Sequence, residues 1–384
     1  MSGSFDSAAI VWSVSHGTAE QVLSFHESAV NAVAILPDGR IVTGGEDGRL
    51  ALWKVGAPLP QQVLTGHTAP IVALAVSPDG ARIASASWDR TVRVWPVDGA
   101  DPLVLEGHQQ NVNGVAFAPD GKTLVSVSHD PQIRIWPLTG GAPTIVTLAT
   151  PLNAVAVGPD GEIVAGGGDG RVYFYSLAGK PKGEVAVAET PLIGIALSRD
   201  GRLVAAAGIQ GAVGIIERSS RQLTRTLVGP GLPVWSTAFL PDNRTLISGG
   251  MDRLVRWWDA STGAPIGAVP IAPADDPLAA YAGHRGAEIY RACVACHALG
   301  PAEGPKAGPS LHRIFGRRIA SLPGYNFSEG LKQLDIVWTP ETVAKLFEVG
   351  PIKYTPGTKM PEQTIGSAED RAALMDFLAK ATAK

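Results

Sequence analysis

Cys293-Val294-Ala295-Cys296-His297 is the stretch that decides the fold of the C-terminal part of this 384-residue chain. The spacing Cys-x-x-Cys-His is typical of a c-type haem attachment site. Two thiols three positions apart on one helical turn can each form a thioether with a porphyrin vinyl group, and His297 then faces the iron. A redox dithiol or half of a zinc site is the alternative. The sequence has only 2 cysteines and no βαβ pattern around them, which argues against both.

A six-coordinate haem iron needs a second axial ligand, and the Met/His pair raises the potential of cytochromes c. Two methionines follow His297. Met375 lies among apolar residues at helical spacing and is predicted to belong to the core. Met360 lies in Tyr354-Thr-Pro-Gly-Thr-Lys-Met-Pro361, where the prolines and the glycine predict an extended loop. A loop can bring a thioether sulfur over the ring, so Met360 is the predicted second metal ligand.

From about residue 286 to 380 the chain resembles a class I, mitochondrial-type cytochrome c, a family that carries single electrons through a covalently bound haem. The matching motifs occur in family order: Cys293 to His297, Gly308-Pro-Ser-Leu311, Phe315-Gly-Arg-Arg318, Pro323-Gly-Tyr325, Ile336-Val-Trp338, Pro356-Gly-Thr-Lys-Met360 and a terminal helix from Glu369. The resemblance implies a small all-α domain with one haem c, attached through Cys293 and Cys296.

The resemblance also implies roles for residues around the haem. Pro309 would accept a hydrogen bond from His297 through its carbonyl group, which fixes the imidazole and tunes the metal. Arg317 and Trp338 match residues that pair with or donate to the haem propionates. Thr358 matches a hydroxyl near the methionine loop.

Two positions depart from the family pattern. Phe327 and Phe347 stand where tyrosines usually place hydroxyl groups near a propionate and near the ligand sulfur. The absence of these two hydroxyl groups is expected to affect the redox potential of the haem rather than the ligands of its iron. With both iron faces occupied by protein atoms, no position is open to a substrate, which favours outer-sphere electron transfer. Candidate lysines for steering an acidic partner at the haem edge are Lys306, Lys345, Lys353 and Lys359.

Repeats fill the preceding part of the chain. A Pro-Asp-Gly turn or a relative of it recurs every 40 to 42 residues, with alternating apolar runs on either side. This pattern predicts antiparallel strands joined by hairpins. The turns lie at Pro37-Asp-Gly39, Pro78-Asp-Gly80, Pro119-Asp-Gly121, Pro159-Asp-Gly161, Arg199-Asp-Gly201 and Pro241-Asp-Asn243.

A second repeated feature is an aspartate that is followed six residues later by an aromatic residue, as in Asp89 and Trp95. Gly-His pairs stand ahead of several strands. These features resemble the WD40 repeat, which builds four-stranded propeller blades. The resemblance implies a buried hydrogen-bonded chain in each blade, for example His67, Ser85 or Ser87, Asp89 and Trp95, with a structural role. The repeat around residues 211–217 lacks the aspartate and the tryptophan, so it is predicted to be a blade without this chain.

The strand count predicts an incomplete seventh blade. Residues 1–26 supply only an outer pair of strands, with Ser2 to Asp6 matching Ser248 to Asp252, and the last outer strand is expected at about Ala264 to Ile271. Covalent haem attachment resembles a process completed outside the bacterial cytoplasm, yet no signal peptide is visible. We therefore expect a periplasmic protein whose Met1 is a misassigned or internal start, preceded by a signal peptide and the missing strands.

The predicted architecture is an all-β, seven-bladed WD40-like propeller with one incomplete blade at residues 1–271, a linker at 272–282 and an all-α class I cytochrome c domain at 283–384. The fold suits a composition with 45 glycines and 30 prolines. No apolar run is long enough to span a bilayer, and no basic run with interleaved aromatics supports nucleic-acid binding. The net charge of −3 assigns no partner.

The predicted function is transfer of single electrons between redox partner proteins, with the propeller as a platform that docks one of them. That platform role is an analogy with WD40 proteins. One alternative is a redox enzyme whose propeller carries a second cofactor or substrate site and uses the cytochrome as electron outlet, although no second haem motif occurs. Another is a redox or ligand sensor, which requires Met360 to detach.

Overall fold

The computed structural model describes residues 1–14, 19–228, 232–252, 254–266, 278–291, 293–294, 297–300, 308–323, 325, 327–358, 360 and 364–383. The chain divides into two compact units, residues 1–274 and 275–384. None of the helices in the described parts of the chain has both the length and the hydropathy that crossing a membrane requires.

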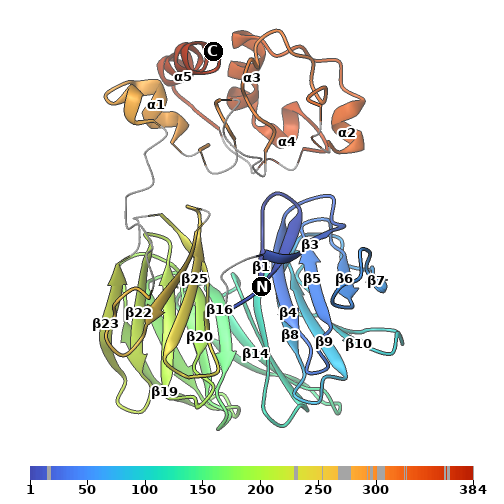
Figure 1. The fold of residues 1–384 in the computed structure, drawn as a ribbon, viewed down its shortest axis with the longest axis vertical. Helices are drawn as coiled ribbons and strands as arrows, with labels where there is room; N and C mark the ends of the chain where they lie inside the picture. The colour runs from blue at the N-terminus through green and yellow to red at the C-terminus, as the bar shows by residue number, and fades with distance from the viewer. Residues whose placement is uncertain are drawn as a thin grey trace. The chain divides into compact units, whose positions relative to one another are not determined.

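The N-terminal unit is a seven-bladed β-propeller of antiparallel sheets (Figure 1). Counting the described residues only, five sheets have four strands, and the first and last sheets have three. In chain order the sheets are β1 (Ser2–Gly3), β2 (Ala8–Trp12) and β3 (Ala19–Ser24); β4 (Val30–Ile35), β5 (Ile41–Gly45), β6 (Leu50–Trp53) and β7 (Gln62–Leu64); β8 (Ile71–Val76), β9 (Arg82–Ser87), β10 (Val92–Pro96) and β11 (Leu103–Leu105); β12 (Val112–Phe117), β13 (Thr123–Ser128), β14 (Gln132–Pro137) and β15 (Thr144–Thr147); β16 (Leu152–Val157), β17 (Ile163–Gly167), β18 (Arg171–Tyr175) and β19 (Pro181–Ala186); β20 (Leu192–Leu197), β21 (Leu203–Gly208), β22 (Ala212–Glu217) and β23 (Gln222–Val228); and β24 (Val234–Phe239), β25 (Thr245–Gly250) and β26 (Val255–Asp259).

The predicted Asp-Gly turns join the first and second strands of the blades. In the turn between β8 and β9, the Asp79 side chain accepts a hydrogen bond from the Ala81 amide at 3.0 Å. Gly80 has φ +70°, a left-handed conformation that glycine adopts without steric cost. Side chains that alternate along each strand bury one apolar set against each neighbouring sheet, so the core is a series of layers between blades.

The buried polar chain predicted from the WD40 resemblance is present in three consecutive blades. Nδ1 of His67 lies 2.7 Å from Asp89 and Nε2 lies 2.7 Å from the Ser85 hydroxyl, which also accepts the Trp95 indole N–H at 2.8 Å. Ser85, rather than Ser87, is therefore the serine of this chain. The same arrangement joins His26, Thr43, Asp47 and Trp53 in one neighbour and His108, Ser126, Asp130 and Trp136 in the other.

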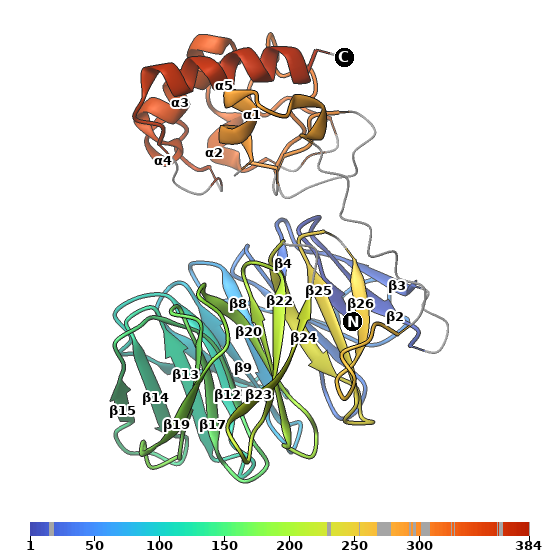
Figure 2. The ribbon, with the colours of Figure 1, turned by 90° about the vertical axis from the view of Figure 1, so that its left-hand side faces the viewer.

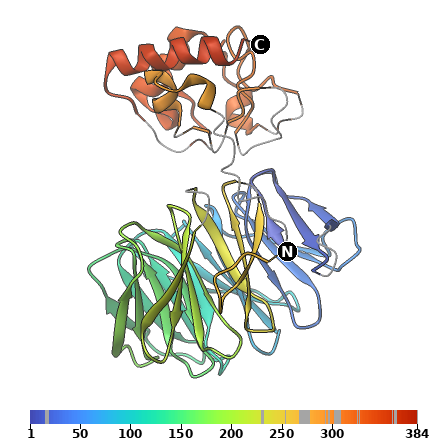
Figure 3. The same ribbon diagram turned by 60° about the vertical axis from the view of Figure 1, so that its left-hand side comes forward.

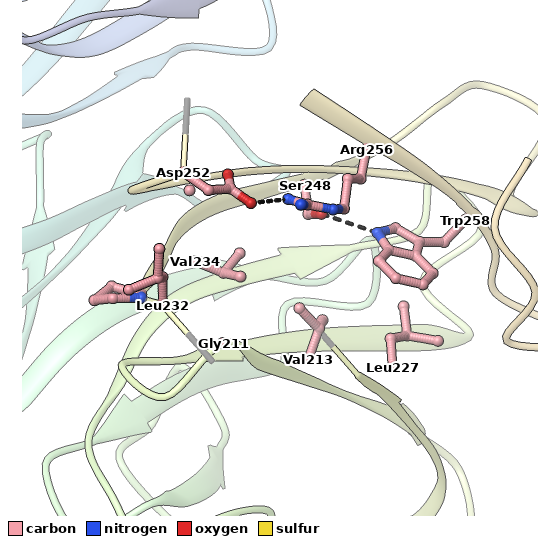
Figure 4. A pocket seen from close by; sticks show the side chains of 11 residues that line it. Gly211, Val213, Leu227, Leu232, Val234, Ser248, Asp252, Arg256 and Trp258 are labelled. Atoms are coloured by element: carbon pink, nitrogen blue, oxygen red, sulfur yellow. Dashed lines mark hydrogen bonds and ion pairs between the residues drawn. The ribbon is translucent and has the colours of Figure 1, made fainter. Parts of the chain in front are cut away.

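Other blades replace the histidine, which the sequence analysis did not foresee. In the last sheet Arg256 forms an ion pair with Asp252, while the Trp258 indole donates to Ser248 at 2.9 Å (Figure 4). In the sheet β16–β19, the Tyr173 hydroxyl donates to Asp169 at 2.6 Å. The sheet β20–β23 is a four-stranded blade in which Ala206 and Ile216 replace the serine and the tryptophan and Gln210 replaces the aspartate, so the polar chain is missing as predicted.

The prediction that residues 1–26 supply only an outer pair of strands was wrong. Ser2 and Gly3 form strand β1, paired with β2, so this blade has three strands rather than an outer pair alone. The match of Ser2 with Ser248 is confirmed, because the Trp12 indole donates to the Ser2 hydroxyl at 2.8 Å, as Trp258 does to Ser248. Two paired residues are too few to produce a recognisable alternation, which is why the sequence missed them.

Two predicted boundaries also change. Instead of a strand at residues 264–271, the described residues contain a single bridge between Trp258 and Pro265, and residues 267–271 lie outside the described residues. The linker predicted at 272–282 extends too far, because Leu278 is 1% exposed and Tyr281 packs against the same core in the C-terminal unit. A short helix, η1 (Ala279–Tyr281), already belongs to that unit.

The C-terminal unit is helical: α1 (Arg285–Tyr290), α2 (Glu329–Lys332), α3 (Pro340–Val349), α4 (Pro351–Tyr354) and α5 (Ala368–Ala381). Helix α1 packs closely against α5. A Cβ atom on Gly286 would overlap the carbonyl oxygen of Ala373 and lie 2.6 Å from the Cβ of Phe377. Glycine is therefore needed for this crossing, which closes the core where Tyr290 packs on Phe377 with ring centroids 5.3 Å apart.

Candidate haem site

The Cys-x-x-Cys-His motif follows directly after α1, whose packing on α5 fixes its position. Cys293 is 7% exposed and belongs to the apolar core of the unit, and its carbonyl group accepts a hydrogen bond from the His297 amide at 3.0 Å. The spacing of this bond, from residue i to residue i+4, is that of a helical turn. Cys296, the second predicted attachment residue, lies outside the described residues.

The side chain of His297 is oriented by a main-chain acceptor. Its Nδ1 lies 2.8 Å from the carbonyl oxygen of Pro309. Because a carbonyl oxygen can only accept, Nδ1 carries the proton, and in the neutral imidazole Nε2 is then the nitrogen with the lone pair. The Leu311 amide donates to the Ala298 carbonyl at 2.8 Å and holds the Pro309 loop against the motif. This is the contact that the family resemblance implied.

The predicted Met360 loop is non-helical in its described part. It begins after α4 ends at Tyr354, and the Thr358 hydroxyl accepts a hydrogen bond from the Met360 amide at 3.1 Å. Met360 is partly buried and packs against the same apolar core as Cys293. Met375 is 7% exposed inside α5, which confirms that it is a core residue. Lys359 lies outside the described residues, as does Lys306.

Main-chain hydrogen bonds join the segment that contains Arg317 to the segment that contains Trp338. The Trp338 amide donates to the Arg317 carbonyl at 2.9 Å, and the Gly316 amide donates to the Trp338 carbonyl at 2.8 Å. The Arg317 guanidinium donates to the carbonyl groups of Ser310 and His312 at 2.6 and 3.2 Å. It thereby holds the loop that contains Pro309, a partner set that the sequence did not indicate.

Within the part of the C-terminal unit that the structure describes, no acidic side chain balances the charge on Arg317. Burial lowers the pKa of Arg317, and among the described residues no carboxylate forms an ion pair with it. A half-buried cation of this kind suits an anionic group such as a propionate. The phenylalanines at the two tyrosine positions add no hydroxyl: Phe347 is buried in the core, and Phe327 packs on Tyr325 with ring centroids 4.7 Å apart.

These residues fit a haem c. They provide a buried thiol, an imidazole with an oriented Nε2, a loop thioether against an apolar core, and a cation without a described carboxylate partner. Soft sulfur and imidazole donors are the protein ligands of cytochrome c haem iron. Groups of three or more residues suited to hold a bare metal ion are absent from the described residues.

Comparison with known proteins gives the same division of the chain. The family of the WD domain, G-beta repeat, matches residues 17–54, 59–96, 101–137 and 221–259, and the family Cytochrome c matches residues 283–382. Cytochrome c of Cochliobolus lunatus is 39% identical over 99 residues, which are 26% of this chain and 91% of that protein. Cytochrome c of Arabidopsis thaliana is 39% identical over 99 residues, 26% of this chain and 88% of that protein. Cytochrome c2 of Rhodomicrobium vannielii is 34% identical over 95 residues, 25% of this chain and 75% of that protein.

The fold and the site thus define a WD40-repeat propeller joined to a haem-binding electron-transfer domain. Through its C-terminal region, the chain belongs to the cytochrome c family.

Proposed function

We propose that this protein is a periplasmic c-type cytochrome that passes single electrons through one covalently bound haem, with its propeller as a docking platform for a redox partner protein. The observation that carries the electron-transfer proposal is the hydrogen bond between His297 Nδ1 and the Pro309 carbonyl oxygen. It holds the imidazole of a Cys-x-x-Cys-His motif in the tautomer that can bind iron through Nε2.

The proposed ligand pair is His297 and Met360, with Cys293 and Cys296 as the thioether residues. Met360 is supported by its place in a loop against the core and by the Thr358 hydroxyl that orients its main chain. The other methionine that follows the motif, Met375, fills the core inside α5. Haem iron held in this way takes up and releases one electron. The protein would hold His297 and Met360 in place as iron ligands and exclude water with the surrounding apolar side chains.

The proposed propeller role follows from tethering. A rigid platform joined to the electron-transfer domain raises the effective concentration of a docked partner to roughly the millimolar range for short linkers. The periplasmic location is supported by the covalent attachment that the motif implies. Cell fractionation tests it directly: the haem protein should be released with the periplasmic contents, and retention with the cytoplasmic contents would contradict the proposal.

The ligand pair is tested with carbon monoxide, which binds ferrous haem only where a coordination position is open. The unaltered, haem-loaded protein should not bind carbon monoxide at neutral pH, whereas Met360→Ala should bind it readily. Met375→Leu is the matched control, because it removes the other methionine at nearly constant volume and should behave as the unaltered protein. Carbon monoxide binding by the unaltered protein, or its absence in Met360→Ala, would overturn the His/Met assignment.

A further inference from the structure

The short helix α2 lies beside α4, from whose end the Met360 loop begins. The two helices are adjacent in two views at right angles to each other (Figures 1 and 2). Helix α2 begins at Glu329, and its residues belong to none of the motifs that identified the haem site. Two residues at its start, Ser328 at the N-cap and Gly330 in the first turn, lie against the loop.

The Ser328 hydroxyl joins two segments of the chain. It accepts a hydrogen bond from the Leu331 amide at 3.4 Å and thereby caps α2. It also donates to the carbonyl oxygen of Gly357 at 2.7 Å. A carbonyl oxygen can only accept, so the hydroxyl proton is used in this second bond. The start of α2 is therefore bonded to the middle of the loop that carries Met360.

The main chains of Gly330 and Gly357 pack directly against each other. A Cβ atom on Gly330 would lie 3.0 Å from the Pro356 carbonyl oxygen and 3.1 Å from the Cα of Gly357. A Cβ atom on Gly357 would lie 3.0 Å from the Cα of Gly330. Gly357 also has φ +85°, a left-handed conformation that favours glycine. Any larger residue at position 330 would therefore push the loop away from α2.

The other hydrogen bonds of the described loop residues are internal to α4 and the loop. The amide and the hydroxyl of Thr355 donate to the Pro351 carbonyl at 2.9 and 2.8 Å. The Thr358 amide donates to the Thr355 carbonyl at 3.0 Å, and the Met360 amide donates to the Thr358 hydroxyl at 3.1 Å. Within the described part of the chain, the Ser328 hydroxyl is thus the donor that ties this loop to a different segment.

We propose that Ser328 and Gly330 are positioning residues for Met360, which hold the loop where its thioether can bind the iron. The inference rests on the His297 and Met360 ligand pair proposed above and names the residues that keep the second ligand in place. Pro356 and Gly357 are exposed, so water takes over the Gly357 carbonyl when the serine hydroxyl is removed. The loop can then move outward, and the coordination position opposite His297 opens more often.

The test uses imidazole as a competing ligand for the ferric, haem-loaded full chain. Imidazole binds only where Met360 has left the iron, so its apparent affinity rises with the fraction of open molecules. Binding is followed by loss of the absorption band that ferric haem shows with methionine sulfur bound. Ser328→Ala removes the hydrogen bond to Gly357, and we expect the apparent dissociation constant of imidazole to fall about three- to tenfold. Gly330→Ala, which pushes the loop outward, should lower it as well.

Two further variants separate this role from a general effect on stability. Ser328→Thr retains a hydroxyl group at the same position and should behave as the unaltered protein. Ser367 caps α5 in the same way, because its side chain accepts from the Asp370 amide at 3.2 Å, but it makes no hydrogen bond to the described loop residues. Helix α5 packs on α1 (Figure 3), so Ser367→Ala should lower the stability of the unit without changing the affinity for imidazole.

Three results would overturn the proposal: unchanged imidazole affinity in Ser328→Ala and Gly330→Ala, an equal change in Ser367→Ala, or no recovery in Ser328→Thr. Failure of the ligand pair gives a different result, because the methionine-sulfur band would then be missing from the unaltered protein. That result would overturn both proposals. A normal band in the unaltered protein, together with unchanged affinities in the variants, would overturn only the positioning role.

Discussion

The Nδ1 atom of His297 lies 2.8 Å from the carbonyl oxygen of Pro309, so a main-chain group of one loop sets the orientation of the proposed iron ligand on another segment. The Arg317 guanidinium holds the same loop through the carbonyl groups of Ser310 and His312. The site is therefore supported mainly by main-chain acceptors, whose positions depend on the loop conformation. Substitutions that loosen the loop should act on the haem without touching it.

Pro309→Ala retains the carbonyl acceptor but frees the backbone of the loop. We expect the hydrogen bond to His297 to weaken, which makes the imidazole a poorer donor and raises the reduction potential of the iron. The free energy of unfolding should also fall by about 0.4–1 kcal/mol. Potentiometric titration measures the first effect. Pro340→Ala, at the first turn of α3, is the control: it should affect stability but not potential.

Gly286→Ala should severely destabilise the C-terminal unit. The new methyl group would overlap the Ala373 carbonyl oxygen, and helix α1 would have to move away from α5. Overpacking of this kind typically costs about 1–3 kcal/mol, and a rigid main-chain neighbour places the cost at the upper end. Thermal unfolding followed by haem absorbance measures it. Gly366→Ala, which has no atom within 4 Å of the added Cβ, should change stability little; equal effects would contradict the packing argument.

The stability of the propeller should fall as the pH drops from about 7 toward 5. Burial lowers the pKa of His108 from its usual 6.5, and this outweighs the raising effect of Asp130. The folded state thus takes up a proton on His108 less readily than the unfolded chain, which becomes protonated below about pH 6.5, so acid favours unfolding. Urea unfolding at several pH values checks this. His108→Asn should reduce the pH dependence, and the exposed His129→Asn should leave it unaltered.

Arg256→Ala should destabilise the last blade by about 3–5 kcal/mol, because it leaves the Asp252 carboxylate buried without its counter-ion. The two side chains are only 7% and 1% exposed. Removing both charges, with Asp252→Asn and Arg256→Met together, should recover most of this loss. Arg171→Ala breaks an exposed ion pair with Glu184 and should cost at most about 1 kcal/mol. A double variant as unstable as Arg256→Ala would show that the ion pair is not the cause.

Local patterns predicted much of this fold. The Asp-Gly turns, with Asp242-Asn243 in the last blade, and the alternation beside them repeat in six of the seven blades. Both act over a few neighbouring residues, so the propeller could be inferred without its tertiary contacts. The substitution of Arg256 for a histidine was not predictable in the same way. Its side chain forms an ion pair with Asp252, four positions earlier in the chain. Arg134 stands four positions after Asp130 in a regular blade, but there the arginine donates to Gln132 instead.

The candidate site was predicted chiefly through family motifs. Their spacing identified His297 and, by resemblance, its Pro309 acceptor, but the carbonyl partners of Arg317 depend on how one loop folds back on another. Leu278 was assigned to the linker because a single apolar residue among prolines and alanines has no periodicity. Only the tertiary structure places it in the core.

The contact of Gly286 with Ala373 has a consequence for how the C-terminal unit is made. It joins the first α-helix of the unit, α1, to the last, α5, so the unit cannot close until translation has passed α5. Its assembly therefore depends on a contact of long sequence separation. Cys293, 7% exposed in the finished core, should stay open to chemistry until then. Haem-free nascent chains arrested before Ala368 should react at Cys293 with a thiol reagent that the completed, haem-free chain resists at this residue.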